Sequence, residues 1–129
     1  MKNIYLLLSG ASLIITAAVH AVFGEINVFR TISKSGLDDL TKISVHIPWH
    51  QLTFILLLSG VILIVISFKN ISRLLPLFIL LIIIGNLLVF LVIAIIQKNW
   101  FILQNSVPQY ILFVITVVLL ILGIKKTVN

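Results

Sequence analysis

Cysteine is absent from this chain, and acidic residues are scarce. The 129 residues include no cysteine, only three acidic residues and 9% charged residues in all. The lack of cysteine excludes disulfides, thiolate metal ligands and thiol catalysis. Soluble domains carry about a quarter charged residues, so this chain has too few to cover a water-exposed surface. The composition therefore excludes an ordinary soluble domain.

Long hydrophobic runs take the place of charge. Hydrophobic residues make up 61% of the chain, and the mean hydropathy is +1.31. They gather in four runs, at residues 4–23, 49–68, 74–96 and 107–124. Each run can cross a hydrocarbon core of about 30 Å as a helix, whereas a lone strand would leave its backbone unbonded in lipid. The sequence predicts a single domain over 1–129, an all-α integral membrane four-helix bundle in the lipid bilayer.

The basic residues predict the orientation of this bundle. On the side of both termini the sequence places Lys2, Lys69, Arg73, Lys125 and Lys126. In the first connection, Arg30, Lys34 and Lys42 are balanced by Glu25, Asp38 and Asp39. This distribution favours both termini in the cytoplasm. The net charge of +6 then reflects topology and anionic lipid, and nothing in it resembles a nucleic-acid-binding patch.

The three predicted connections differ in length. The first, residues 24–47, is long, and its apolar residues recur at helical spacing from Leu37 to Ile47, which predicts a short amphipathic helix on the outer surface. The second, residues 69–73, is so short that it predicts a tight hairpin of the second and third spans. The string LLLSG at 6–10 and 56–60 is interpreted as chance similarity, with its Ser-Gly pairs allowing close helix contact.

The histidines converge on one membrane face in this topology. His20 lies near the end of the first span, and His46 and His50 lie at the start of the second. Histidines four residues apart share one helix face and can bind one metal ion. His20 and Glu25 would complete the shell, with Gly24 ending the first helix so that Glu25 folds back over His20. The sequence predicts a transition-metal site.

A b-type haem is the second cofactor that the histidines allow. His20 and His50 would be its two axial ligands. Pro48 disfavours helix at the preceding residue, which leaves His46 in the loop and makes His20 and His50 the safer pair. If the site is catalytic, His50 or Glu25 would act as general base beside a Lewis-acid metal, but no substrate class follows.

Three short segments resemble a known pattern. They are residues 20–25 (HAVFGE), 49–53 (WHQLT) and 108–110 (PQY). The pattern is similar to that of small, uncharacterised bacterial four-helix integral membrane proteins, in which the first span ends in H-x-x-x-G-E and the second opens with W-H. The resemblance implies a protein of the bacterial cytoplasmic (inner) membrane and draws attention to His20, Glu25 and His50. His46 is this sequence's own feature.

Two functions of different class remain open from the sequence. In the first, an outward-facing His/Glu pocket binds a transition metal or haem. In the second, the chain is an accessory or structural subunit of a larger membrane complex with no cofactor of its own. The expected partners are the lipid bilayer and either other membrane subunits or further copies of this chain. Histidines bonded to backbone carbonyls would favour the second function.

Overall fold

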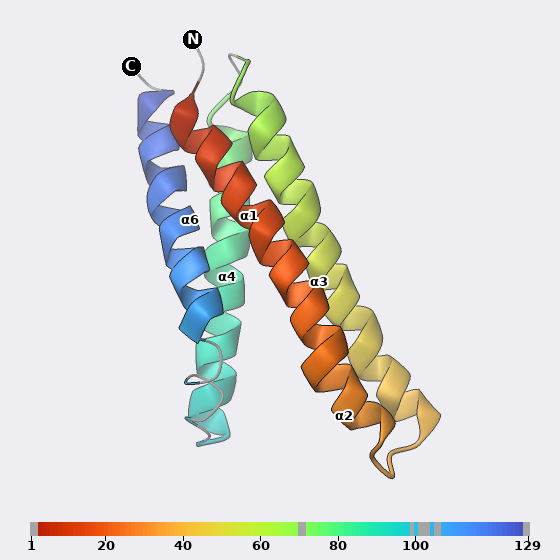
Figure 1. The fold of residues 1–129 in the computed structure, drawn as a ribbon. Coiled ribbons are helices and arrows are strands. Elements are labelled where there is room, and N and C mark those ends of the chain that lie inside the picture. Colours follow the sequence, from red (N-terminus) through yellow and green to blue (C-terminus); the bar gives the residue numbers. More distant parts are fainter. Residues whose placement is uncertain (1–2, 70–71, 99, 101–103, 105–106, 128–129) are drawn as a thin grey trace.

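The chain is a bundle of four long helices. The computed structural model describes residues 3–69, 72–98, 100, 104 and 107–127. The long helices are α1 (Ile4–Phe23), α3 (Asp39–Ile66), α4 (Leu74–Ile96) and α6 (Val107–Lys126). All four are long and apolar enough to cross a membrane, which confirms the predicted all-α membrane fold. The start of α1 and the end of α6 lie at the same end of the bundle (Figure 1), here called the terminal end. The opposite end is the histidine end.

The first connection is mostly helical. After α1 the chain continues as a π-helix, η1 (Gly24–Phe29), and a short α2 (Arg30–Ser33), and α3 already begins at Asp39. The predicted amphipathic helix over 37–47 therefore forms the first turns of α3 instead of a separate element. Asp38 caps α3, since its carboxylate accepts hydrogen bonds from the Thr41 hydroxyl and backbone N–H, which lower the pKa of Asp38.

Pro48 lies inside α3 and does not end it. A proline removes one intrahelical hydrogen bond and disfavours helix in the residue before it. Side chains from η1 contact α3 on both sides of this position, at His46 and at His50. The expectation that His46 lies in a loop is therefore wrong, because tertiary contacts outweigh the local preference of the X-Pro bond.

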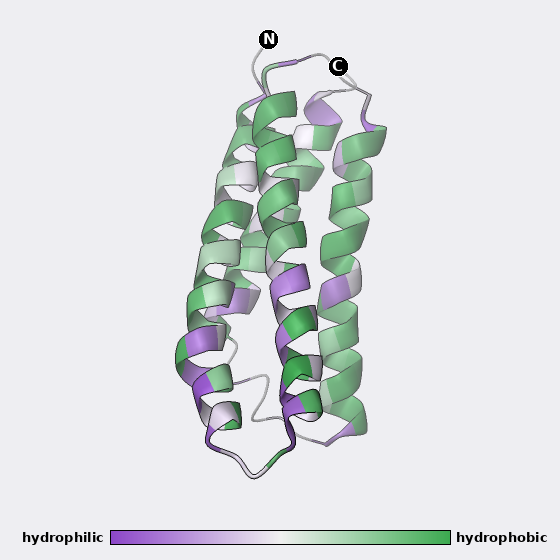
Figure 2. Ribbon diagram, turned by 90° about the vertical axis from the view of Figure 1, so that its right-hand side faces the viewer, coloured by the Kyte–Doolittle hydropathy of each residue, from purple (hydrophilic) through white to green (hydrophobic). Residues whose placement is uncertain are grey.

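Helix α1 is the centre of the bundle. It packs against α3 on one side and against α6 on the other, and α4 packs mainly on α6 (Figure 1). The short second connection joins α3 to α4, but these two helices make few contacts with each other in the described part of the chain. The predicted tight hairpin of the second and third spans is therefore wrong. Hydrophobic residues cover the long middle of all four helices (Figure 2), as a lipid-facing surface requires.

Two glycines allow α1 and α3 to touch. A Cβ added to Gly10 would lie 2.6 Å from the Gly60 carbonyl oxygen, and one added to Gly60 would lie 2.8 Å from the Gly10 carbonyl oxygen. The repeated LLLSG string therefore has a reciprocal role, because each copy places its glycine against the other. This confirms that the Ser-Gly pairs permit close backbone contact.

Polar groups fasten the terminal end and the middle of the bundle. The Asn3 backbone N–H donates to Ser67 O, and its side-chain amide donates to Gly123 O, both at 2.8 Å. Asn3 thus joins the start of α1 to the ends of α3 and α6. Farther along, the Ser12 hydroxyl lies 2.8 Å from that of Thr116, and Thr116 itself donates to Leu112 O, so Ser12 donates to Thr116 and links α1 to α6.

Candidate functional site

The π-helix after α1 places the residues of the candidate site. Along the inner face of the first helix the buried positions are His20, Gly24 and Phe29, so the step lengthens from four residues to five. A π turn is wider than an α turn, and single π turns inside helices are frequent at functional sites. A regular α-helix would bring Val28, not Phe29, to this face, because it repeats about every 3.6 residues. The π turn therefore sets Phe29 against α3.

Gly24 accommodates a tryptophan and does not end the helix. Its backbone is helical, at φ −56° and ψ −53°. A Cβ at this position would overlap the indole nitrogen of Trp49. The expectation that Gly24 ends the first helix and folds Glu25 back over His20 is thus wrong. Gly24 is needed because a larger residue would displace Trp49.

Trp49 covers His20. The two rings stack with centroids 4.2 Å apart and an interplanar angle of 7°, and the Trp49 indole N–H donates to the His20 carbonyl oxygen at 3.1 Å. His20 is only 5% exposed. A tryptophan at the start of a span is typical of the membrane interface, but Trp49 lies between α1 and α3. The sequence signal for this packing is Gly24, one turn after His20, because a glycine leaves room for the Trp49 ring.

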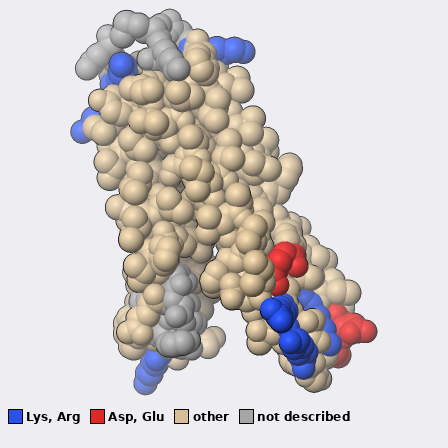
Figure 3. Space-filling model, in the orientation of Figure 1, with Lys and Arg blue, Asp and Glu red and all other residues tan. Residues whose placement is uncertain are grey.

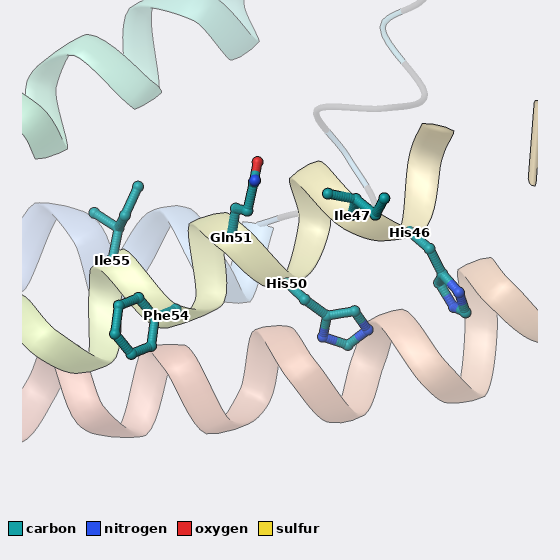
Figure 4. A pocket seen from close by; sticks show the side chains of 6 residues that line it. All are labelled: His46, Ile47, His50, Gln51, Phe54 and Ile55. Carbon is teal, nitrogen blue, oxygen red and sulfur yellow. The ribbon is translucent and has the colours of Figure 1, made fainter. Parts of the chain in front are cut away.

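Glu25, His46 and His50 form a group at the histidine end. His50 Nε2 lies 3.0 Å from Glu25 Oε1, and one possible ligand atom from each of the three residues lies within 4.8 Å of the others. Both imidazoles are directed from α3 toward the neighbouring helix, on the side opposite Gln51 (Figure 4). Phe29 contacts both, with ring centroids 3.7 Å from His46 and 5.5 Å from His50. The group could hold a metal ion.

The sequence-predicted ligand set is only partly brought together. Glu25, His46 and His50 belong to the group, and His20 does not. His50 and Glu25 are about half exposed, at 45% and 56% of their side-chain area, whereas His20 is buried under Trp49. His46, which the X-Pro argument had weakened as a candidate, is a full member of the group.

The contacts account for two of the three segments that carry the resemblance, H-x-x-x-G-E and W-H. Trp49 packs over Gly24, and His50 pairs with Glu25, so the W-H dipeptide of α3 meets the G-E dipeptide of the first helix residue by residue. The histidine of H-x-x-x-G-E stacks on the same tryptophan. These motifs therefore describe one contact between two helices.

A cavity of about 680 Å³ lies beside this contact, between the α1–α3 pair and the α4–α6 pair. These pairs diverge toward the histidine end (Figure 1), and the surface is hollowed between them (Figure 3). Its lining residues include His20, Trp49, Asn86, Gln109 and Tyr110. The Asn86 amide donates within its own helix, to Ile82 O at 2.9 Å.

Two buried polar groups at this cavity have no hydrogen bond of normal geometry within the described residues. They are the His20 imidazole, at both ring nitrogens, and the Tyr110 hydroxyl. Buried polar groups in proteins are almost always hydrogen-bonded, so each exception asks for an explanation. Tyr110 is a residue to which the sequence gave no role.

Comparison with known proteins adds no further identification. A scan against protein-family models, a search of curated proteins and a search of solved structures each found no match to this chain. The resemblance to small bacterial four-helix membrane proteins stays a prediction, and function has to be argued from the geometry of the site.

Proposed function

We propose that this membrane protein binds a divalent transition-metal ion through Glu25, His46 and His50. The observation that carries the proposal is the convergence of three ligand atoms to within 4.8 Å of one another. Two imidazoles and one carboxylate suit zinc and its neighbours, whose bonds to these ligands are about 2.0–2.2 Å long. The side chains of Glu25 and His50 are half exposed, so small changes of rotamer can bring them into the coordination shell.

The site would join two helices. His46 and His50 come from α3, whereas Glu25 comes from η1, so an ion bound by all three bridges the first connection near its turn. Phe29 limits the movement of both imidazoles by packing against them. Three protein ligands leave at least one position of a tetrahedral shell for water or another molecule. The proposed metal centre therefore has a free coordination position, and the half-exposed side chains of Glu25 and His50 leave that position accessible.

The proposal is restricted to an ion because both predicted haem ligands are engaged elsewhere. His20 is stacked on Trp49, and His50 Nε2 is paired with Glu25 Oε1. A bis-histidine haem would have to displace both contacts. The haem of the sequence analysis stays a prediction, which the absorption spectrum described below also tests.

We further propose that the terminal end faces the cytoplasm of a bacterial cell and the metal site faces outward. The terminal end carries Lys69, Arg73, Lys125 and Lys126 with no acidic residue, whereas acidic and basic residues mix at the histidine end (Figure 3). The counts of basic residues at the two ends are similar, so the proposal rests on this uncompensated positive charge.

Cobalt titration of untagged protein in a mild detergent would test the metal site. Co²⁺ substitutes for Zn²⁺ and gives visible bands whose intensity reports a shell of few ligands. We expect saturation at one ion per chain and displacement by Zn²⁺. His46→Ala, His50→Ala and Glu25→Gln should each weaken binding at least about tenfold, since each removes one of three ligands. Asp39→Asn is the matched control, because it neutralises an exposed carboxylate outside the group.

Metal analysis and a visible spectrum of the protein as purified complete the experiment. Binding that is unchanged in all three ligand variants, or equally weakened in Asp39→Asn, would refute the proposal. A folded protein that takes up no ion would instead favour the accessory subunit, with Glu25 and His50 serving only as an ion pair between helices. A Soret band would point to the predicted haem.

A further inference from the structure

We propose a second site, in which the cavity between the α1–α3 and α4–α6 pairs binds a neutral, lipid-soluble ring compound that carries carbonyl or hydroxyl oxygens, the chemistry of a quinone head group. This inference does not depend on the metal site, because the residues that line the cavity do not include Glu25, His46 or His50. The proposal commits to this one ligand class, and other occupants are outcomes of the test.

The unpartnered polar groups point to a ligand. His20 is only 5% exposed, and neither of its ring nitrogens makes a hydrogen bond of normal geometry with the described residues. The Tyr110 hydroxyl, on a different helix, is also buried and without a hydrogen bond to the described residues, although the Tyr110 residue as a whole is partly exposed. Both residues line the cavity. Two separate helices thus present hydrogen-bonding groups to one space, the unpaired Tyr110 hydroxyl and the His20 imidazole, whose one backbone contact, with Trp49, falls short of normal hydrogen-bond geometry. An oxygen-bearing ligand would satisfy them.

The lining determines the charge of the ligand. None of the described lining residues is Asp, Glu, Lys or Arg, and the ionisable side chains among them are His20 and Tyr110. An ionic head group would have no counter-ion here, and burying it would be costly. A carbonyl or hydroxyl oxygen needs only a hydrogen-bond partner, which a neutral imidazole and a phenol provide. The ligand is therefore neutral.

The rim determines the route of entry. Phe23, Val45 and Val89 line the cavity and are also exposed on the surface of helices that cross the membrane. Val89 lies within the apolar part of α4, so a molecule can enter past it from the hydrocarbon region, whereas Val45 lies next to His46 at the histidine end. The ligand is therefore lipid-soluble, with its apolar part able to remain in the bilayer.

The aromatic lining favours a flat ring. On one side Trp49 and His20 stack face to face, and on the other Phe90 and Tyr110 meet edge to face at 5.6 Å between centroids. Stacked or edge-on contact with such side chains favours planar ligands over branched chains. A volume of about 680 Å³ is within the range of pockets that hold drug-sized molecules.

Tryptophan fluorescence provides a direct test. The chain has two tryptophans, so Trp100→Phe leaves Trp49 in the cavity wall as the reporter. Protein in liposomes is titrated with decylubiquinone, whose quinone ring quenches indole fluorescence at short range. We expect saturable quenching of Trp49. In the Trp49→Phe protein, where Trp100 reports, quenching should rise only in proportion to quinone in the bilayer.

Two tyrosine variants test the hydrogen bond. Tyr110→Phe keeps the ring and removes the hydroxyl, so it should weaken binding roughly two- to tenfold, the value of one hydrogen bond. Tyr5→Phe removes the chain's other tyrosine hydroxyl, which is outside the cavity and near Lys126, and should leave the affinity unchanged. His20→Phe provides a second variant that keeps a flat ring against Trp49, and it too should weaken binding.

Three results would overturn the proposal. The first is proportional quenching of Trp49 without saturation. The second is equal affinity in Tyr110→Phe, His20→Phe and Tyr5→Phe. The third is equal competition by an alkane of the same chain length, which would show that the oxygens and the ring are not recognised. Each result is independent of cobalt binding at Glu25, His46 and His50.

Discussion

Replacing Gly60 by alanine should separate α1 from α3. The new Cβ would lie 2.8 Å from the Gly10 carbonyl oxygen and 2.8 Å from Ile14 Cγ1. The Ile14 side chain can rotate, but a backbone oxygen cannot move without its helix. Gly10→Ala meets the same obstacle from the other side, with its Cβ 2.6 Å from the Gly60 carbonyl oxygen. Either methyl group therefore forces the two helices apart at their crossing.

The expected cost follows from two opposing terms. Overpacking a closely packed contact costs about 1–3 kcal/mol. Alanine in a helix interior returns roughly 0.8–1.0 kcal/mol relative to glycine. The difference is a loss of about 0–2 kcal/mol of the free energy of unfolding for each single variant, and we expect the upper half of this range because the obstacle is a backbone oxygen. The double variant should lose less than the sum of the two, because helices already separated by one methyl group have room for the second.

Reversible unfolding in mixed detergent micelles, followed by far-UV circular dichroism, measures these free energies. Gly85→Ala is the matched control, since it lies in α4 and a Cβ there would meet nothing within 4 Å. It should leave stability unchanged or raise it by up to about 1 kcal/mol. The reasoning is refuted if Gly60→Ala behaves like Gly85→Ala, or if the costs of Gly10→Ala and Gly60→Ala simply add.

Two further predictions concern the terminal end and the orientation. Asn3→Ala should lower the free energy of unfolding by about 1–3 kcal/mol, because it leaves Gly123 O without its buried donor and removes the cap on Leu6 N. Asn3→Ser, which keeps a capping oxygen without adding a charge, should lose less, and equal losses in the same unfolding assay would contradict this account. In the cysteine-free chain, a single cysteine at Ser35 should react with a membrane-impermeant maleimide added to intact cells, whereas one at Thr127 should react only after lysis. The reverse pattern would invert the proposed topology.

Much of the membrane architecture could be predicted from the sequence because lipid imposes few solutions. Four apolar runs without interior charge require four helices, and their number places both termini on one side. The lengths of the connections were less predictable. The sequence predicts a long first connection with a separate short helix over 37–47, yet residues 24–33 continue the first helix and α3 already begins at Asp39. Contacts of Phe29 and Glu25 with α3, which no local pattern shows, join the two helices here.

The candidate site, too, could be predicted only in part from the sequence. Sequence alone brought all three histidines and Glu25 to one end of the bundle, because that follows from topology. It could not show that the π turn directs Glu25 and Phe29 to His46 and His50, or that Trp49 separates His20 into a different environment. One extra residue in a helical turn rotates every later side chain by about 100° around the helix axis, and no local sequence pattern predicts where such a turn occurs.

From the sequence alone one can predict a membrane protein, the number of its spans, and the end of the bundle that holds its histidines and acidic residues. These properties depend on composition and on the order of apolar runs. The tertiary structure decided which glycine meets which backbone, which histidines share a group and where a cavity remains. Those outcomes depend on the packing of side chains between helices, where a single methyl group or one extra residue in a turn changes the partner.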